Sequence, residues 1–404
     1  MDQTLKKKFK TIEKNPSLIY LDSAASSLKI DDSIQSMVNY YETSGANISR
    51  GTYALGIETT QAYEASREVV ATYVGAEKKE EIIFTKGTTQ SMNMLAYHFE
   101  KKLKKGDEIL SSELEHNASV LPFQRVALTT GATLSYVDLD EDLRIHTTNV
   151  INQISTSTKV IVLTYVSNVM GYITDLKPII KKAHDVGAIV IVDAAQAAPH
   201  ITIDVKDLGC DFLAFSGHKC YGPTGVGVLY GRYDVLNQLV PFEVGGGMVD
   251  EVELHTHTYL DLPERLEAGT PPIAEVIGLA PALNYILEVG HETIMNHSKK
   301  LQKYLLEALE NRSYIKVYNP KSDIGIVTFN IQDVHAHDVQ SFLSENNIAV
   351  RTGHHCAKLL QKRLETSATI RVSFQIYNDT GDIDKLLDVL DATYHFFKIG
   401  RAHV

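Results

Sequence analysis

The sequence predicts an α/β protein: a mainly parallel mixed sheet covered by helices, followed by a smaller α+β region. Between about residues 82 and 230, short apolar runs alternate with amphipathic segments, which is typical of βαβ units. After about residue 269 this alternation stops, and long helical patterns precede scattered strands. The chain has 404 residues, of which 44% are apolar, so it is long and apolar enough to form more than one core.

The strands of the region at residues 82–230 are predicted from short apolar runs. These runs predict strands at EIIFT (81–85), DEIL (107–110), TLSYVDL (133–139), KVIVLTYV (159–166), AIVIVDAA (188–195) and the start of FLAFSGHKCYGPTGVGVLYG (212–231). Amphipathic segments at residues 88–106 and 176–187 end in lysine and glycine, as helix C-termini often do. Strands that alternate with helices in this way form a parallel sheet that is buried on both faces.

The C-terminal region is predicted element by element from the same patterns. One or two long helices span residues 270–311, and a strand follows at 324–331. The remaining elements are a helix at 336–347, a short strand at 348–353, a strand at 369–376 and a final helix at 381–397.

Charge and composition exclude several classes of protein. The net charge is −11 and no long basic run occurs, so we do not expect a nucleic-acid partner. The basic N-terminal LKKKFK lacks the apolar segment of a signal peptide, and no apolar run approaches the roughly 20 residues that cross a bilayer. Only three cysteines are present, which suits a reducing cytoplasm and no disulfide framework.

In a parallel sheet, ligands bind beyond the carboxyl ends of the strands, so the residues that follow each apolar run are candidates for a site. After residues 81–85 come Thr88 and Thr89 at the start of a helix, which predicts either a phosphate site or an ordinary helix cap. His116 follows the next strand and could be catalytic or structural, and Asn117 could cap the next helix.

Three later strands end in further polar residues. Asn168 follows the run at 159–166, Asp193 and Gln196 follow the run at 188–195, and Ser216, His218 and Lys219 follow the last run. A buried acid is costly unless it is paired, so Asp193 calls for a cofactor nitrogen, a helix dipole or an arginine. Lys219 is either a surface lysine at a strand end or a reactive amine.

Pyridoxal phosphate (PLP) requires this combination of groups: a lysine for a Schiff base, an acid beside the pyridine nitrogen, and a phosphate cradle. We therefore expect Lys219 to bond to the aldehyde carbon and Asp193 to face the pyridine nitrogen. Gln196 would face the ring oxygen, and His116 would stack on the ring. The groups expected to hold the phosphate are Thr88, Thr89, Ser216 and His218.

The motifs VDAAQAAPH and FLAFSGHKCYGPTGVGVLYG resemble the PLP fingerprint of the class V aminotransferase family. RTGHHCA, which contains Cys356, and RVSFQIYN after it resemble the group II, SUF-type cysteine desulfurases. The likeness extends over nearly the whole chain, through YLDSAASSLK, NISRGTYALG, FTKGTTQSMN, ELEHNASVLPF, VSNVMG and EAGTPPIAEVIGL.

The resemblance implies the fold type I of PLP-dependent transferases, with a large PLP-binding domain at residues 21–284. Residues 1–20 and 285–404 would form a small domain that carries the cysteine loop. In activity, the resemblance implies removal of sulfur from L-cysteine to give L-alanine and a persulfide on the enzyme. A protein of iron–sulfur cluster assembly would accept the sulfur.

The resemblance also implies roles for individual residues. Lys219, Cys356 and His116 would be catalytic: Lys219 moves protons at the substrate Cα, and Cys356 is the nucleophile. Arg371 would bind the substrate carboxylate, with Asn168 and Arg351 beside the substrate. Members of the family are homodimers, and Thr270 would reach the phosphate held by the partner subunit.

Other interpretations stay open at this point. A selenocysteine lyase or another class V aminotransferase would share most of the site, and a scaffold that binds PLP without catalysis would keep Lys219. A nicotinamide enzyme would need G-x-G-x-x-G between a strand and a helix, which the glycine-rich segments here do not match. Adjacent His354, His355 and Cys356 lack a fourth ligand at a standard spacing, so we expect no metal site. Ser49, Pro272 and Phe123 depart from the usual family residues.

Overall fold

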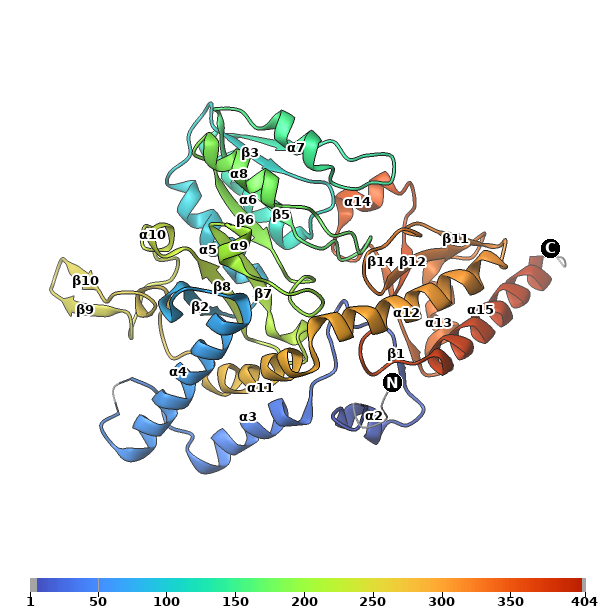
Figure 1. Ribbon diagram of the computed structural model, residues 1–404, viewed down its shortest axis with the longest axis horizontal. Helices are drawn as coiled ribbons and strands as arrows, with labels where there is room; N and C mark the ends of the chain where they lie inside the picture. Colours follow the sequence, from blue (N-terminus) through green and yellow to red (C-terminus); the bar gives the residue numbers. More distant parts are fainter. Residues whose placement is uncertain (1–5, 50, 402–404) are drawn as a thin grey trace.

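The main sheet of the computed structural model, which describes residues 6–49 and 51–401, has seven strands (Figure 1). Their order is β2-β8-β7-β6-β5-β3-β4, and only β8 runs antiparallel to its neighbours, so the prediction of a mainly parallel mixed sheet is confirmed. The strands are β2 (Ile82–Thr85), β3 (Glu108–Ser111), β4 (Thr133–Tyr136), β5 (Thr158–Thr164), β6 (Ile189–Asp193), β7 (Phe212–Ser216) and β8 (Gly227–Gly231).

Both faces of this sheet are buried, because the strands are apolar at nearly every position. Val160 and Val162 of β5 belong to a core that includes residues of α5 (Thr88–Glu100) and α6 (Asn117–Thr130). Ile161 and Leu163 point to the opposite face and belong to a second core. The helices and turns that follow the strands are α7 (Thr147–Gln153), α8 (Lys177–Asp185), α9 (Val205–Leu208), η2 (Gly217–Lys219) and α10 (Tyr233–Leu236).

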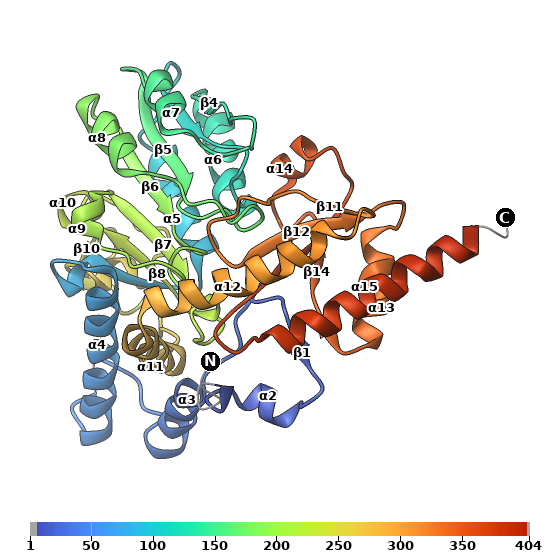
Figure 2. The ribbon, with the colours of Figure 1, turned by 45° about the vertical axis from the view of Figure 1, so that its right-hand side comes forward.

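A smaller antiparallel sheet lies beside the first and forms its own core (Figure 2). Its strand order is β11-β12-β15-β14. The elements of this region are α12 (His291–Glu310), β11 (Ile315–Val317), β12 (Ile326–Ile331), α13 (Ala336–Glu345), β14 (Arg351–Gly353), α14 (Lys358–Arg363), β15 (Thr369–Ser373) and α15 (Thr380–Arg401).

The N-terminal segment lies against the C-terminal region. Strand β1 (Ile19–Tyr20) pairs in parallel with β13 (Ile348–Ala349), although the two are far apart in the sequence. The next residues then cross toward the main sheet. Two helices from this part of the chain pack against a later one: α3 (Asp31–Thr43) and α4 (Ala54–Val74) both contact α11 (Ile273–Val289). The remaining elements are α2 (Lys10–Lys14), η1 (Lys79–Glu81), η3 (Glu264–Leu266) and the hairpin of β9 (Val249–Val252) and β10 (His257–Tyr259).

The structure corrects several expected boundaries. The single strand expected at residues 348–353 is interrupted at Val350, because β13 pairs with β1 whereas β14 pairs with β15. The long helical pattern at residues 270–311 forms two helices, since Gly290 adopts a φ of +83° between them. The strand expected at 133–139 ends at Tyr136. Arg50, within NISRGTYALG, lies outside the described residues.

The domain boundaries stay a prediction. Strand β1 pairs with β13, which lies in the sequence between β12 and β14 of the small sheet, and residue 284 falls inside α11, which packs on α3 and α4. Among residues 6–49 and 51–401, no single helix is both long and apolar enough to cross a membrane; α11 and α12 pass that test only as a pair, bent by 76°.

Candidate active site

A cavity of about 250 Å³ lies at the carboxyl ends of β5, β6 and β7. All of the site residues predicted from the sequence line it except Thr270. The predicted residues that line the cavity are Thr88, Thr89, His116, Asn168, Asp193, Gln196, Ser216, His218, Lys219, Arg351, Cys356 and Arg371. The cavity therefore brings together the residues predicted from strand ends with Arg351, Cys356 and Arg371, which the family resemblance implied.

Lys219 ends the short 3₁₀ turn that follows β7. Burial lowers the pKa of Lys219 to about 8; Asp193 opposes this shift, and nearby Arg371 contributes to it. A larger share of the amine is thus uncharged near neutral pH than for an ordinary lysine. Uncharged nitrogen is the nucleophilic form, so Lys219 is suited to attack a carbonyl.

Asp193 is the last residue of β6, and its side chain is only 3% exposed. Its carboxylate accepts hydrogen bonds from Ser119 Oγ (2.6 Å) and from the Ala195 N–H (3.0 Å). No arginine or lysine nitrogen among the described residues forms an ion pair with it. A buried carboxylate on a cavity wall without a protein cation fits a ligand that brings its own positive charge.

Hydroxyl groups converge where α5 begins. Thr88 donates its main-chain N–H to Ser216 Oγ (2.9 Å), and the two side-chain oxygens lie 2.8 Å apart. Gly87 precedes the helix with a φ of +146°, a conformation that favours glycine. Burial and the charge of Lys219 lower the pKa of His218 to about 4, so this histidine is a neutral hydrogen-bonding group at pH 7.

His116, rather than Asn117, caps α6. Its Nδ1 accepts the Ala118 N–H at 3.1 Å, and Asn117 is the first helical residue. Burial and Lys219 lower the pKa of His116, which favours a neutral ring with its proton on Nε2. Gln196 donates from Nε2 to the Ala24 carbonyl (2.6 Å).

Cys356 lies in a turn whose backbone is unusual for residues other than glycine. His355 and Cys356 have φ values of +50° and +54°, which cost energy unless neighbours hold the turn. Two hydrogen bonds do so: Asn168 Nδ2 donates to the His355 carbonyl (2.8 Å), and the Asn117 N–H donates to the Cys356 carbonyl (2.7 Å). Cys356 is the exposed cysteine, whereas Cys210 and Cys220 are buried.

Cys356 faces a second hollow as well as the cavity. This outer groove, of about 400 Å³, runs along the start of α6. It is lined by Thr89, Asn93, His116, Asn117, Ala118, Leu121, Pro122, Arg125 and Cys356. The sulfur of Cys356 thus stands at the boundary between the interior cavity and the surface.

The two histidines before Cys356 differ in their surroundings. His355 is buried, and its Nε2 lies 2.8 Å from Thr369 Oγ1. Burial and the two nearby arginines hold the pKa of His355 far below its usual range, so it carries no charge with which to stabilise a thiolate. His354 is exposed.

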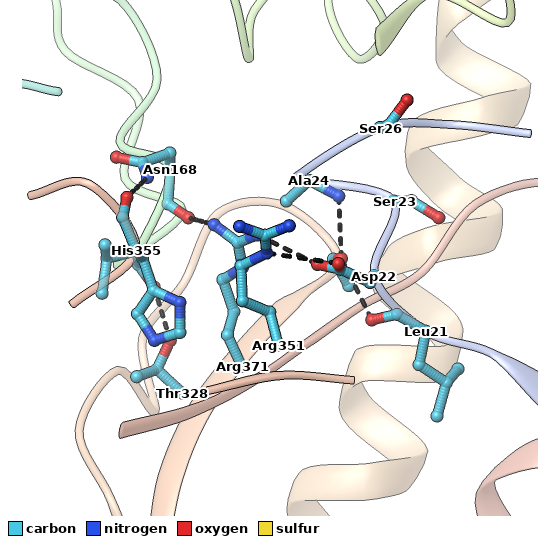
Figure 3. Close-up of polar contacts among 12 residues, drawn as sticks. Leu21, Asp22, Ser23, Ala24, Ser26, Asn168, Thr328, Arg351, His355 and Arg371 are labelled. Carbon is cyan, nitrogen blue, oxygen red and sulfur yellow. Dashed lines mark hydrogen bonds and ion pairs between the residues drawn. The ribbon is translucent and has the colours of Figure 1, made fainter. Parts of the chain in front are cut away.

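Two arginines meet on the wall of the cavity, opposite each other on β14 and β15 (Figure 3). Arg371 is buried; it donates from Nη1 to the Asn168 carbonyl (2.8 Å), and its Nε has no partner among the described residues. Asp22 pairs with both arginines: its carboxylate lies 3.2 Å from Arg371 Nη2 and 3.2 Å from Arg351 Nε.

Thr270 lies apart from the cavity. It lines a separate hollow of about 480 Å³, together with Ser49, Gly247 and Glu267. Its placement leaves its predicted role toward a partner subunit as a proposal.

Sequence reasoning missed several residues of the site. Asp22 and Ala24 belong to the motif YLDSAASSLK. They follow β1, a strand of only two residues, so no long apolar run precedes them. Ser119 sits inside a helix, and no strand-end signal marks it. The Asp-Ser pair just after an apolar stretch was the one signal that could have indicated Asp22.

Comparisons with known proteins agree with this geometry. The family model for class-V aminotransferases matches residues 19–386. The chain belongs to that family. A probable cysteine desulfurase of Halalkalibacterium halodurans is 45% identical over 94% of each chain. Solved cysteine desulfurases of Escherichia coli and Thermococcus onnurineus are each 36% identical and superpose with TM-scores of 0.92 and 0.93, covering 97% and 98% of this chain and 98% of each of those chains.

This class-V enzyme is a PLP-dependent cysteine desulfurase with the fold of those structures. The cavity fits the cofactor on its own evidence. It offers a buried carboxylate without a protein cation, a buried amine whose pKa is lowered, and converging hydroxyls at the start of a helix. The residues that would hold PLP are Lys219, Asp193, Gln196, His116, Thr88, Thr89, Ser216 and His218.

Proposed function

We propose that Cys356 removes the sulfur atom of L-cysteine and carries it as a persulfide, leaving L-alanine. The observation that supports this proposal is the position of Cys356, which lines the same cavity as Lys219 and also the outer groove. A thiol at this boundary can react with a substrate inside and then present the sulfur to a protein outside.

Each residue has a definable task in this reaction. Arg371 and Arg351 bind the substrate carboxylate, and Asp193 would hold the pyridine nitrogen of the cofactor. When bound, PLP supplies an electron sink for the pair released at the substrate Cα. Lys219, whose pKa is lowered by burial, accepts the Cα proton as a base.

The sulfur transfer itself balances without a further reactant. The Cys356 thiolate forms an S–S bond to the substrate sulfur, and the substrate C–S bond breaks. The carbon keeps that electron pair and takes up a proton, which yields the methyl group of alanine. Cys356 attacks as the thiolate, which is the nucleophilic form of a cysteine.

The test is incubation of the holoenzyme with L-cysteine. Alanine should form without any keto acid, and one sulfur atom should be added to the Cys356 peptide by mass spectrometry. Cys356→Ala should retain the cofactor absorption but lose nearly all alanine formation. Cys210→Ala, at a buried cysteine outside the cavity, is the matched control. Near-normal turnover by Cys356→Ala would exclude the nucleophile role, and dependence on a keto acid would indicate an aminotransferase.

We also propose the wider setting of the enzyme. The acceptor is a protein of iron–sulfur cluster assembly, which would dock over the outer groove, and L-selenocysteine is a possible second substrate to be assayed beside L-cysteine. A free exposed thiol that must stay reduced suits the cytoplasm.

A homodimer is the proposed assembly, with Thr270 reaching the phosphate of PLP in the partner subunit. The position of Thr270 outside its own cavity supports this arrangement. Light scattering after size-exclusion chromatography should give twice the chain mass. A Thr270→Ala variant should bind PLP more weakly while staying dimeric; a monomeric wild-type protein with full activity would overturn the proposal.

A further inference from the structure

The carboxylate of Asp22 is placed between two guanidinium groups. Arg351 and Arg371 are register partners on adjacent antiparallel strands, so their side chains emerge on the same face of the sheet. Two like charges in that position repel each other. Asp22 relieves the repulsion by offering one oxygen to each arginine, as Figure 3 shows.

The main chain around Asp22 is held firmly. The Ser373 N–H donates to the Leu21 carbonyl (2.8 Å), and the Ala24 N–H donates to Ser373 Oγ (2.9 Å). The Leu21 N–H donates to the Ala349 carbonyl (2.9 Å). Asp22 is thus fixed to the same strand that carries Arg371, and it is not a loop residue that meets the arginines by chance.

The three side chains divide into an inner and an outer group. Arg351 and Arg371 line the cavity, whereas Asp22 is not among the described residues that line it. The Arg371 side chain is 2% exposed, that of Asp22 is 16% exposed and that of Arg351 is 45% exposed, so the group extends from the interior to the surface. The Asp22 carboxylate therefore contacts the two guanidinium groups from the side away from the cavity. Their remaining N–H groups are left to bind a ligand.

The charges of this group leave one positive charge to be matched. Two guanidinium groups carry two positive charges, and Asp22 cancels one of them. We propose that Asp22 is a specificity-determining residue, which limits the arginine pair to a single carboxylate of the substrate. This inference depends on the proposed role of Arg371 and Arg351 in binding that carboxylate. It adds that the one remaining positive charge of the arginine pair matches an amino acid with a single carboxylate, such as cysteine, and does not match a substrate with a second carboxylate.

Binding of unreactive carboxylates to the holoenzyme tests the inference. Propionate and succinate lack an amino group and differ by one carboxylate, and isothermal titration calorimetry at low ionic strength measures both. In Asp22→Asn, the affinity for succinate relative to propionate should rise on the order of 10- to 100-fold, because a unit charge at close range acts in a partly buried site. In Arg351→Gln, which removes a positive charge, the same ratio should fall.

Two controls separate charge from structure. Asp22→Asn combined with Arg351→Gln restores the net charge and should restore the wild-type ratio. Asp142→Asn, which removes a carboxylate from an exposed ion pair with Lys321, should leave the ratio unchanged. If Asp22→Asn fails to bind PLP, the double variant is compared with Arg351→Gln, because the two differ only at Asp22; equal ratios in them would overturn the role of Asp22.

The outcomes distinguish the two levels of the proposal. Wild-type enzyme that turns over L-cysteine and binds propionate, with equal ratios in all variants, would overturn the role of Asp22 alone. Wild-type enzyme that neither binds carboxylates at Arg371 nor forms alanine from L-cysteine would overturn the proposed function first.

Discussion

The side-chain amide of Asn168 donates a hydrogen bond of 2.8 Å to the main-chain carbonyl of His355. This contact joins the loop after β5 to the turn that carries Cys356, and the main-chain oxygen of Asn168 accepts from Arg371 on its other side. One asparagine therefore connects the large sheet, the cysteine turn and the proposed carboxylate site.

Asn168→Ala should loosen the cysteine turn. The His355 carbonyl would lose a buried partner, which costs about 1–3 kcal/mol of unfolding free energy. We expect turnover of L-cysteine to fall by about 100-fold, since small displacements of a reacting group have effects of that size. Iodoacetamide should alkylate Cys356 at a changed rate. Asn378→Ala, which removes another buried amide that donates to a carbonyl (Tyr20, 2.9 Å), should be destabilised similarly but leave alkylation unchanged.

Attachment of PLP to the apoprotein should depend on pH through Lys219. The uncharged amine reacts, and burial lowers the pKa of Lys219 to about 8. The rate of attachment should rise as the pH increases through about 8 and then level off, whereas an unshifted lysine would keep rising to about pH 10. Stopped-flow absorbance gives the rate, and borohydride reduction followed by peptide mapping shows which lysine reacted. Attachment at unchanged rate in Lys219→Ala would contradict the assignment.

Glu115 should make stability depend on pH. The carboxyl is 1% exposed, and burial raises its pKa to about 8, with Asp193 adding to the effect. The folded protein then holds a proton that the unfolded chain loses above its normal pKa, so the free energy of unfolding contributed by Glu115 falls as pH rises from about 4.5 to about 8.

Glu115→Gln should remove that contribution. Urea denaturation at several pH values should give a flatter profile for this variant than for the wild type. Glu113→Gln, at a partly exposed carboxylate that pairs with Arg363, is the neighbouring control and should keep the wild-type profile. Parallel profiles for wild type and Glu115→Gln would show that Glu115 does not hold the proton.

The free energy of unfolding should fall when either partner of the buried ion pair between Arg67 and Glu267 is removed. Arg67 donates two hydrogen bonds to the Glu267 carboxylate, at 2.7 and 2.9 Å, and both side chains are nearly inaccessible. Glu267→Gln should lower the free energy of unfolding by about 3–5 kcal/mol, because the buried Arg67 would keep, of its contacts with carboxylates, only the longer one with Glu64, at 3.3 Å. Glu100→Gln breaks a more exposed pair with Arg125 at 3.8 Å and should change stability by about 1 kcal/mol or less. Equal effects in the two variants would contradict the argument.

The site could be predicted from the sequence where a residue directly follows an apolar strand. Asp193 and Lys219 are of this kind, because the end of a buried parallel strand fixes both their position and the edge of the sheet they share. The mainly parallel sheet followed from the same runs. Cys356 needed the family resemblance, since its turn is placed by hydrogen bonds from Asn117 and Asn168, which no local pattern encodes.

The features that could not be predicted from the sequence depend on contacts between distant segments of the chain. Asp22 acquires its role only because β1 pairs with β13 and the next residues pair with Ser373. Ser119 reaches Asp193 from the first turn of α6, where its sequence neighbourhood resembles any other helix. The break at Val350 was missed because one apolar run serves two different partner strands.

The segment of residues 19–28 has a consequence for the order of events during synthesis of the protein. Residues 19–28 are translated well before His218, Ala349 and Ser373, to which they form hydrogen bonds. The part of the cavity wall formed by Ala24 and Ala25 therefore cannot be completed until the chain has been made as far as Ser373. We therefore expect firm binding of PLP only after Ser373 has been made, and ribosome-bound fragments that stop before Ser373 should retain PLP weakly.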